Sequence, residues 1–311
     1  MTDLEFICPR DGDRIERISE AIYRCVKCGK NYPYEHGVVR LLDKNDSFYE
    51  GVYTGQVTFT PKVDKWWAVW PLWLINSGFL WAIRKNVQSG KTIVELGCAA
   101  GVLYLGQRYR MIGCDLSYAS LKKLDGIYEK LVQADASTCL PMRENSVDAI
   151  VSSFFWEHIT EPNKRQILSE CRRVLRPGGK IIFLYDVETD NPLIKYFKMN
   201  NPTLYDKVFI DGDAHVGYQR PNDNLKIFLD SGFSILEHRG LEKTFLQSAS
   251  TYSKLAQFGG RFEPFFKLMS IFDRKPWFYF YTGVIRITDG LLCPLLPLKW
   301  ARIDLTVAQK D

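Results

Sequence analysis

Three carboxylates stand at the ends of successive apolar runs in the middle of the chain: Glu95, Asp115 and Asp135. Each run reads as a buried strand, because it is short, apolar and bounded by small or polar residues. Strands of a parallel sheet end at the same edge, so we expect the three side chains to face one ligand. Carboxylates accept hydrogen bonds from hydroxyls and amines and repel phosphates. The set therefore suits a ligand with a cationic or amino group better than a phosphate.

The loop after the first run consists of small residues, in the order Gly97-Cys98-Ala99-Ala100-Gly101. Small residues let a ligand approach the backbone closely at the carboxyl edge of a sheet. The glycine spacing differs from G-x-G-x-x-G, the pattern of loops that bind a dinucleotide. This difference argues against a bound pyrophosphate.

Two histidines are candidates for a general base or a contact to the substrate. His158 lies in FFWEHI, directly after an expected strand, and His215 lies in DGDAHVGYQRP, inside a long insertion. A histidine at either place could accept a proton from a reacting group. In the alternative interpretation, His158 only packs against the ligand loop and His215 is a loop histidine bonded to backbone.

The elements that must position these residues follow an alternating pattern. A helix is expected over 162–175, because Pro162 suits its first turn and Ile167, Leu168 and Cys171 form an apolar stripe. The Pro-Gly-Gly sequence at 177–179 should end this helix in a turn. Alternation of short apolar runs with helices predicts an α/β fold with a parallel sheet. The expected strands cover 92–96, 110–114, 147–152, 180–185, 232–236 and 301–307.

The order of these features resembles class I S-adenosylmethionine-dependent methyltransferases. Besides TIVELGCAAG, RMIGCDLS and LVQADAS, the chain contains LPMRENSVDAIVSS and RVLRPGGKIIF, which resemble two further landmarks of that family. The resemblance implies a Rossmann-like sheet that is mostly parallel, with an antiparallel last strand. It also implies that S-adenosylmethionine is the cofactor. The residues expected to bind it are Glu95, Gly97, Cys98, Ala99, Gly101, Asp115, Leu116, Asp135, Ala136 and Ser153.

The resemblance assigns a role to several of these residues. Asp115 would hold the ribose hydroxyls, Asp135 would contact the adenine amino group, and the loop from Gly97 to Gly101 would line the methionine portion. Ala99 departs from the family, which usually has a glycine at the middle of this loop. The extra methyl group narrows the loop slightly.

A cysteine-bearing segment precedes these elements. Cys8 and Asp11 lie in CPRD, and Cys25 and Cys28 lie in CVKCGKNYP. The segment resembles a degenerate zinc ribbon, of the kind that precedes the catalytic domain in some bacterial RNA methyltransferases, with Asp11 in place of one thiolate. Three thiolates and one carboxylate would complete a structural zinc site, with His36 as a weaker fourth ligand. In the alternative interpretation, the segment has lost its fourth ligand and no longer binds zinc.

The chain divides into three parts on these grounds. Residues 1–43 form the zinc-ribbon-like module, 44–90 a linker with an aromatic cap segment, and 91–311 the Rossmann-like domain. Two helical insertions, at 187–220 and 241–299, are long enough to fold over a site. The second is rich in aromatic and apolar residues and could line a pocket for an apolar acceptor.

The aromatic cap segment contains a stretch without charges, from Trp66 to Ile83. Pro71 and several tryptophans favour an aromatic cover or contact with a membrane surface over a membrane-spanning helix. The scattered cysteines and the absence of a signal-peptide pattern at the start suit a reducing compartment. We therefore expect a cytoplasmic protein, with peripheral membrane contact as an open alternative.

The net charge of +5 is too small and too evenly spread to indicate an extensive phosphate-binding surface. This favours methyl transfer to a small molecule, a lipid or a lipid-linked glycan. An RNA methyltransferase is the first alternative, suggested by the zinc-ribbon resemblance. A non-catalytic cofactor-binding or adaptor protein is the second. The sequence does not indicate the oligomeric state.

Overall fold

The computed structural model describes residues 5–43, 50, 76–99, 101–274 and 277–311. Within them the strands form one eleven-stranded mixed sheet, in the order β1-β2-β3-β4-β7-β6-β5-β8-β9-β11-β10. The strands are β1 (Ile15–Arg17), β2 (Ile22–Cys25), β3 (Asn31–Glu35), β4 (Val38–Arg40), β5 (Thr92–Leu96), β6 (Arg110–Asp115), β7 (Lys130–Gln133), β8 (Val147–Ser153), β9 (Leu175–Asp186), β10 (Phe233–Leu241) and β11 (Ile303–Lys310).

The middle of the sheet is parallel and its end is antiparallel. Strands β7, β6, β5, β8 and β9 pair in parallel, whereas β11 lies antiparallel between β9 and β10. Every residue of β5 is buried, as expected for a strand covered on both faces. The predicted Rossmann-like sheet with an antiparallel last strand is therefore confirmed.

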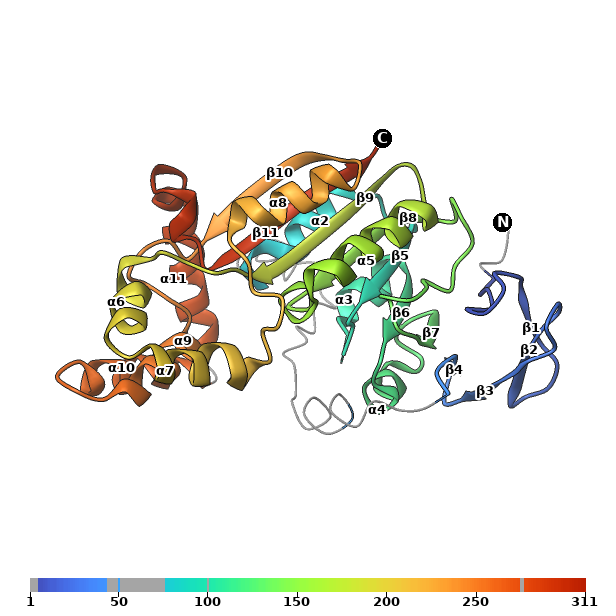
Figure 1. Ribbon diagram of the computed structural model, residues 1–311, viewed down its shortest axis with the longest axis horizontal. Helices are drawn as coiled ribbons and strands as arrows, with labels where there is room; N and C mark the ends of the chain where they lie inside the picture. The colour runs from blue at the N-terminus through green and yellow to red at the C-terminus, as the bar shows by residue number, and fades with distance from the viewer. Residues whose placement is uncertain (1–4, 44–49, 51–75, 100, 275–276) are drawn as a thin grey trace.

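Helices cover both faces of the sheet, each over its own apolar core (Figure 1). One face carries α5 (Glu161–Val174) and α8 (Pro221–Asp230). The other carries α2 (Phe79–Asn86) and α3 (Leu103–Arg108). The shorter helices α4 (Tyr118–Leu121) and η4 (Lys122–Leu124) follow β6.

The predicted helix over 162–175 is confirmed as α5, but the turn expected at 177–179 is not a separate turn. These residues lie inside β9, where Gly178 has a φ of 73° and the register with β8 shifts near Val147. A glycine with positive φ lets the strand bulge at this point, and pairing with β8 resumes at Lys180, opposite Ala149.

The cysteine-bearing segment is joined to the sheet, although we expected a separate module. Strand β4 pairs in parallel with β7, with Val38 opposite Leu131. Cys8, Ile15 and Tyr32 also belong to the same apolar cluster as the central strands. Two short hairpins bury too little apolar surface to fold alone, and the open edge of β7 supplies the missing partner.

The two predicted insertions fold together into a helical unit that we call the cap. Its helices from the first insertion are α6 (Pro192–Asn200), α7 (Pro202–Tyr205), η6 (Asp206–Ile210) and η7 (Asp211–Asp213). Those from the second are α9 (Ala249–Leu255), η8 (Ala256–Phe258), α10 (Glu263–Ser270), η9 (Ile271–Asp273), α11 (Trp277–Leu291), η10 (Cys293–Leu295) and η11 (Leu298–Trp300).

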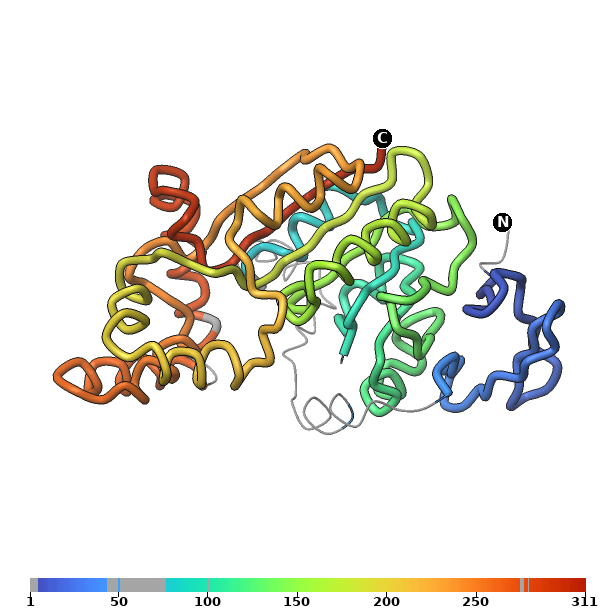
Figure 2. Tube along the Cα trace, viewed as in Figure 1, coloured from blue at the N-terminus to red at the C-terminus, as the bar shows by residue number. Residues whose placement is uncertain are grey.

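The cap has an apolar core of its own. Phe197 and Phe209 from the first insertion pack there with Tyr252 and Phe266 from the second. Figure 2 shows the two insertions side by side, at the opposite end of the molecule from the N-terminal hairpins. The cap is therefore one packed body built from two distant pieces of chain.

The charge-free aromatic stretch falls mostly outside the described residues, which include it only from residue 76 onward. There η3 (Asn76–Gly78) leads into α2, whose Phe79, Leu80 and Ile83 are buried against the sheet. Among the described residues, no helix combines the length and the hydropathy that a bilayer crossing requires.

Candidate active site

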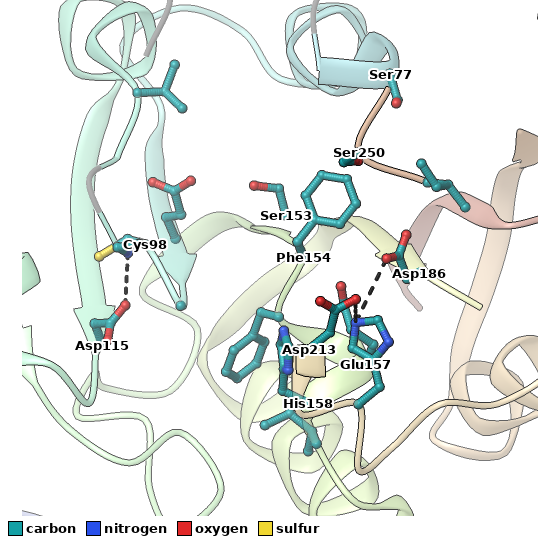
Figure 3. A pocket seen from close by; sticks show the side chains of 18 of the residues that line it. Ser77, Cys98, Asp115, Ser153, Phe154, Glu157, His158, Asp186, Asp213 and Ser250 are labelled. Atoms are coloured by element: carbon teal, nitrogen blue, oxygen red, sulfur yellow. Dashed lines mark hydrogen bonds and ion pairs between the residues drawn. The ribbon is translucent and has the colours of Figure 1, made fainter. Parts of the chain in front are cut away.

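A cavity of about 870 Å³ lies between the carboxyl edge of the sheet and the cap. Figure 3 shows Cys98 and Asp115 on one side of it, Glu157, His158 and Asp213 on the other, and Ser153 and Phe154 between them. Each residue that the sequence assigned to the cofactor or to catalysis is among those that line this cavity: Glu95, Gly97, Cys98, Ala99, Gly101, Asp115, Leu116, Asp135, Ala136, Ser153, His158 and His215.

The small-residue loop needs its two glycines for different contacts. Gly97 and Gly101 both have positive φ, 61° and 60°. A Cβ on Gly97 would lie 2.6 Å from the Phe155 ring, and one on Gly101 would lie 2.5 Å from Leu124. Ala99 also has a positive φ, 41°, which for a residue with a Cβ costs roughly 1–2 kcal/mol.

Asp115 fixes the shape of this loop. Its Oδ2 accepts a hydrogen bond of 2.9 Å from the Ala99 N–H, and its Oδ1 accepts one of 2.8 Å from the Ser117 N–H. Burial raises the pKa of Asp115 above its ordinary value. A carboxylate has about four acceptor positions, so two backbone bonds leave room for the two hydroxyls of a ribose.

Asp135 is held in a similar way at the end of the next strand. Its Oδ1 accepts hydrogen bonds from the N–H and the hydroxyl of Ser137, at 2.8 and 2.7 Å. This arrangement fixes the carboxylate in the wall of the cavity, where it can accept a bond from an amino group.

Glu95 lines the cavity, but one of its oxygens has a partner within the protein. The hydroxyl of Tyr128 donates a short hydrogen bond to Glu95 Oε2 and accepts one of 2.8 Å from the Val102 N–H. Burial raises the pKa of Glu95 to about 7. The expectation that Glu95 simply faces the ligand missed this buried link between β5, the loop and Tyr128.

Glu95 should make the protein less stable as the pH rises. Its folded-state pKa is above its unfolded value, so the native state holds the extra proton and loses this advantage between pH 4.5 and 7. The loss is on the order of 3 kcal/mol. We expect the free energy of unfolding in urea to fall between pH 5 and 7.5 in the parent, and to lack this fall in Glu95→Gln. An equal fall in the two proteins would contradict the raised pKa of Glu95.

The two candidate histidines lie next to each other, with ring centroids 5.3 Å apart. His158 belongs to η5 (Trp156–His158), and its Nδ1 lies 3.0 Å from the carbonyl oxygen of Ala214. His215 is 7% exposed and stacks on Tyr218. Its Nε2 lies 3.9 Å from carboxylate oxygens of both Asp186 and Asp213.

Burial lowers the pKa of His215, which keeps its imidazole neutral near pH 7. A neutral imidazole beside a carboxylate can accept a proton. The arrangement therefore suits a proton acceptor on the side of the cavity that His215 lines.

Sequence reasoning missed several residues of this region. Asp186 ends β9, and the rule that identified Asp115 at the end of β6 could have identified it as well. Lys164 gave no such signal, because it lies on α5 and is fully buried. Its Nζ donates to the Gly217 carbonyl and to Asn224 Oδ1, at 2.7 and 3.0 Å, which ties the loop carrying His215 to α5 and α8.

The N-terminal cysteines also converge. The ligand atoms of Cys8, Asp11, Cys25 and Cys28 all lie within 4.8 Å of one another. The sulfurs of Cys8 and Cys28 are 3.8 Å apart. Zn–S bonds of 2.3 Å in a tetrahedron give a separation of about 3.8 Å, so the spacing fits zinc. Among the described residues, His36 is not part of this group.

Residues 94–183 match the family model described as a methyltransferase domain. A demethylmenaquinone methyltransferase of Clavibacter sepedonicus is 30% identical over 168 residues, which are 49% of this chain and 61% of that protein. A tRNA (carboxymethyluridine(34)-5-O)-methyltransferase of Arabidopsis thaliana is 33% identical over 103 residues, 32% of this chain and 25% of that protein. The chain thus spans less than two thirds of these relatives.

Solved structures show lower identity. The structure of a cyclopropane synthase from Mycobacterium tuberculosis has a TM-score of 0.49 and 14% identity, over 75% of this chain and 83% of that one. The matched segment 94–183 runs from β5 to β9. It contains the small-residue loop, Asp115, Asp135 and His158.

Proposed function

We propose that this chain is an S-adenosylmethionine-dependent methyltransferase that acts on a small-molecule, lipid or lipid-linked acceptor. The observation that carries the proposal is the placement of Glu95, Asp115 and Asp135 around one cavity, together with the small-residue loop. The match of residues 94–183 to a methyltransferase domain supports the same conclusion.

The chemistry requires alignment more than activation. A sulfonium methyl group is already reactive, so the protein must hold it in line with the acceptor and exclude water. Asp115 and Asp135 would fix the ribose and the adenine. His215 would receive the proton that the acceptor loses, with His158 beside it.

The cap side of the cavity suggests the class of acceptor. Phe278, Tyr281 and Ile285 of α11 line it, together with Arg286, which pairs with Asp289. Polar side chains, among them Ser250 and Lys254, lie beside these apolar ones. A wall with both kinds of group suits an apolar molecule that has a reactive polar end. The relative that is named as a demethylmenaquinone methyltransferase supports a small-molecule acceptor.

The experiment that tests the proposal is transfer of a radiolabelled methyl group to fractionated cell extract. We expect label in the lipid or small-molecule fraction, and calorimetric binding of S-adenosylmethionine and S-adenosylhomocysteine. Absence of binding to both would reject the proposal. Cofactor binding without transfer to any fraction would favour a non-catalytic adaptor.

An RNA acceptor is the second candidate, because a relative that covers part of the chain is named for a tRNA. RNA binding must weaken steeply with salt, since it releases counterions from the phosphates. Filter retention of total RNA at low and high salt tests this. No retention at low salt would remove the RNA candidate.

We further propose that Cys8, Asp11, Cys25 and Cys28 hold a structural zinc ion. Four protein ligands leave no open position, so the ion would stabilise the hairpins instead of taking part in catalysis. We expect Cys25→Ser to lose one zinc equivalent by atomic emission and to unfold at lower temperature. Cys139→Ser, outside the cluster, should keep its zinc. Equal zinc content in the parent and Cys25→Ser would contradict the assignment.

A further inference from the structure

A second cluster of possible metal ligands lies in the cavity itself. One ligand atom each from Glu157, His158 and His215 lies within 4.8 Å of the other two. Glu157 and His158 come from η5 after β8, and His215 comes from the insertion after β9. Figure 3 shows Glu157, His158 and Asp186 close together at one side of the cavity.

Two buried polar atoms of this cluster have no hydrogen-bond partner among the described residues: Glu157 Oε2 and His215 Nδ1. Glu157 is 1% exposed and His215 is 7% exposed. An unpartnered buried polar atom costs roughly 1–3 kcal/mol. Two such atoms from distant segments in one cluster indicate that a ligand completes them.

The nearest buried cation does not supply that partner. Lys164 Nζ is already bonded to the Gly217 carbonyl, Gln219 Oε1 and Asn224 Oδ1, at 2.7, 2.8 and 3.0 Å. Lys164 therefore leaves Glu157 Oε2 without a hydrogen-bond partner among the described residues.

The surroundings of His158 suit a metal ligand. Its Nδ1 lies 3.0 Å from the Ala214 carbonyl, which can only accept a hydrogen bond, so Nδ1 carries the proton. Nε2 is then the nitrogen with a lone pair. Metal-bound histidines have this arrangement, because a backbone carbonyl on one nitrogen orients the other toward the ion.

We propose that Glu157, His158 and His215 bind a divalent transition-metal ion, of the class that includes Zn²⁺, Co²⁺ and Mn²⁺. Two imidazoles and one carboxylate suit these ions and leave coordination positions open toward the cavity. Asp186 and Asp213 lie 3.9 Å from His215 Nε2 and pair with Arg302 and Lys254, so both carboxylates add negative charge beside the site.

The open positions indicate what the ion would do. A divalent ion binds oxygen anions, such as a phenolate or an enolate, and lowers the pKa of the corresponding hydroxyl. Gly97 and Phe155 are in contact distance, so the loop assigned to the cofactor adjoins η5. If the proposed methyl transfer is correct, the ion would hold the acceptor oxygen beside the cofactor. With the ion bound, the acceptor's proton would pass to water instead of to His215, because the free nitrogen lone pair of His215 would be on the ion.

The test is Co²⁺ titration of the full-length protein after metal removal, followed by visible absorption and by metal analysis. Thiolate-to-cobalt charge transfer identifies ions in the cysteine cluster, and ligand-field bands without it identify ions in the cavity. We expect the Glu157→Gln/His215→Gln variant to bind one equivalent less than the parent, with any charge-transfer band unchanged. His36→Asn, a histidine variant outside the cavity, should bind as the parent does.

If the parent and the double variant bind the same number of Co²⁺ equivalents, the metal site in the cavity is rejected. It is also rejected if the parent, even at millimolar Co²⁺, shows only the charge-transfer band of the cysteine cluster. If the double variant fails to fold by circular dichroism, His215→Asn alone provides the comparison. Binding of S-adenosylhomocysteine to the parent is measured in parallel. If the parent binds S-adenosylhomocysteine but no metal in the cavity, only the metal site is rejected. If it binds the metal but not S-adenosylhomocysteine, the methyltransferase proposal is rejected.

Discussion

Asp115→Ala is expected to weaken S-adenosylmethionine binding by about a hundredfold or more. Two hydrogen bonds from ribose hydroxyls to a charged acceptor contribute roughly 3 kcal/mol or more, and 1.4 kcal/mol is a factor of ten. The substitution also removes the acceptor for the N–H groups of Ala99 and Ser117. The loop would then lose the contact that holds Ala99 at a positive φ.

Calorimetric titration with S-adenosylmethionine measures this effect. The matched control is Asp148→Ala, because Asp148 also accepts a backbone N–H, that of Thr92, but at the opposite end of β5. We expect the control to lose stability while its cofactor affinity stays within about threefold of the parent. An Asp115→Ala protein that binds as tightly as the control would show that the ribose lies elsewhere.

Gly217→Ala is expected to destabilise the protein by on the order of 3 kcal/mol and to abolish methyl transfer. A Cβ at this position would lie 1.7 Å from the carbonyl oxygen of Ile159, and backbone atoms cannot move aside as a flexible side chain can. The Gly217 N–H donates to the Glu157 carbonyl at 2.9 Å. Separation of the two segments would therefore move His215 away from Glu157 and His158.

Urea unfolding and the radiolabel assay measure the two consequences. Gly283→Ala is the matched control, since Gly283 lies in α11 and a Cβ there would meet no atom within 4 Å. Alanine is the better helix former by about 1 kcal/mol, so the control should be equally or more stable than the parent. A Gly217→Ala protein with parental stability would mean that the loop can relax without loss of the site.

The sequence determined the features that depend on short stretches of chain. Apolar runs and the helix over 162–175 are local patterns, and β5, β6, β8 and α5 lie within one residue of where these patterns indicated, whereas β9 and β10 are longer than expected. Asp115 and Asp135 could be assigned because each lies at the end of its own strand, and parallel strands end at one edge.

Only the tertiary structure decided the contacts between distant segments. Nothing near Glu95 in the chain indicates that Tyr128 would bond to it, and the pairing of β4 with β7 depends on an edge formed far away in sequence. The turn expected at 177–179 became part of β9 because the strand is paired with β8 on both sides of it, at Leu175 and at Lys180.

The acceptor side of the site shows this division most clearly. The sequence identified His158 and His215 separately, but not that they lie together with Glu157. Their proximity depends on buried Lys164 and on Gly217, which fit the second segment against η5. Residue type and spacing thus determined which side chains can do chemistry, whereas packing over long chain separations decided which of them meet, because such contacts leave no local pattern.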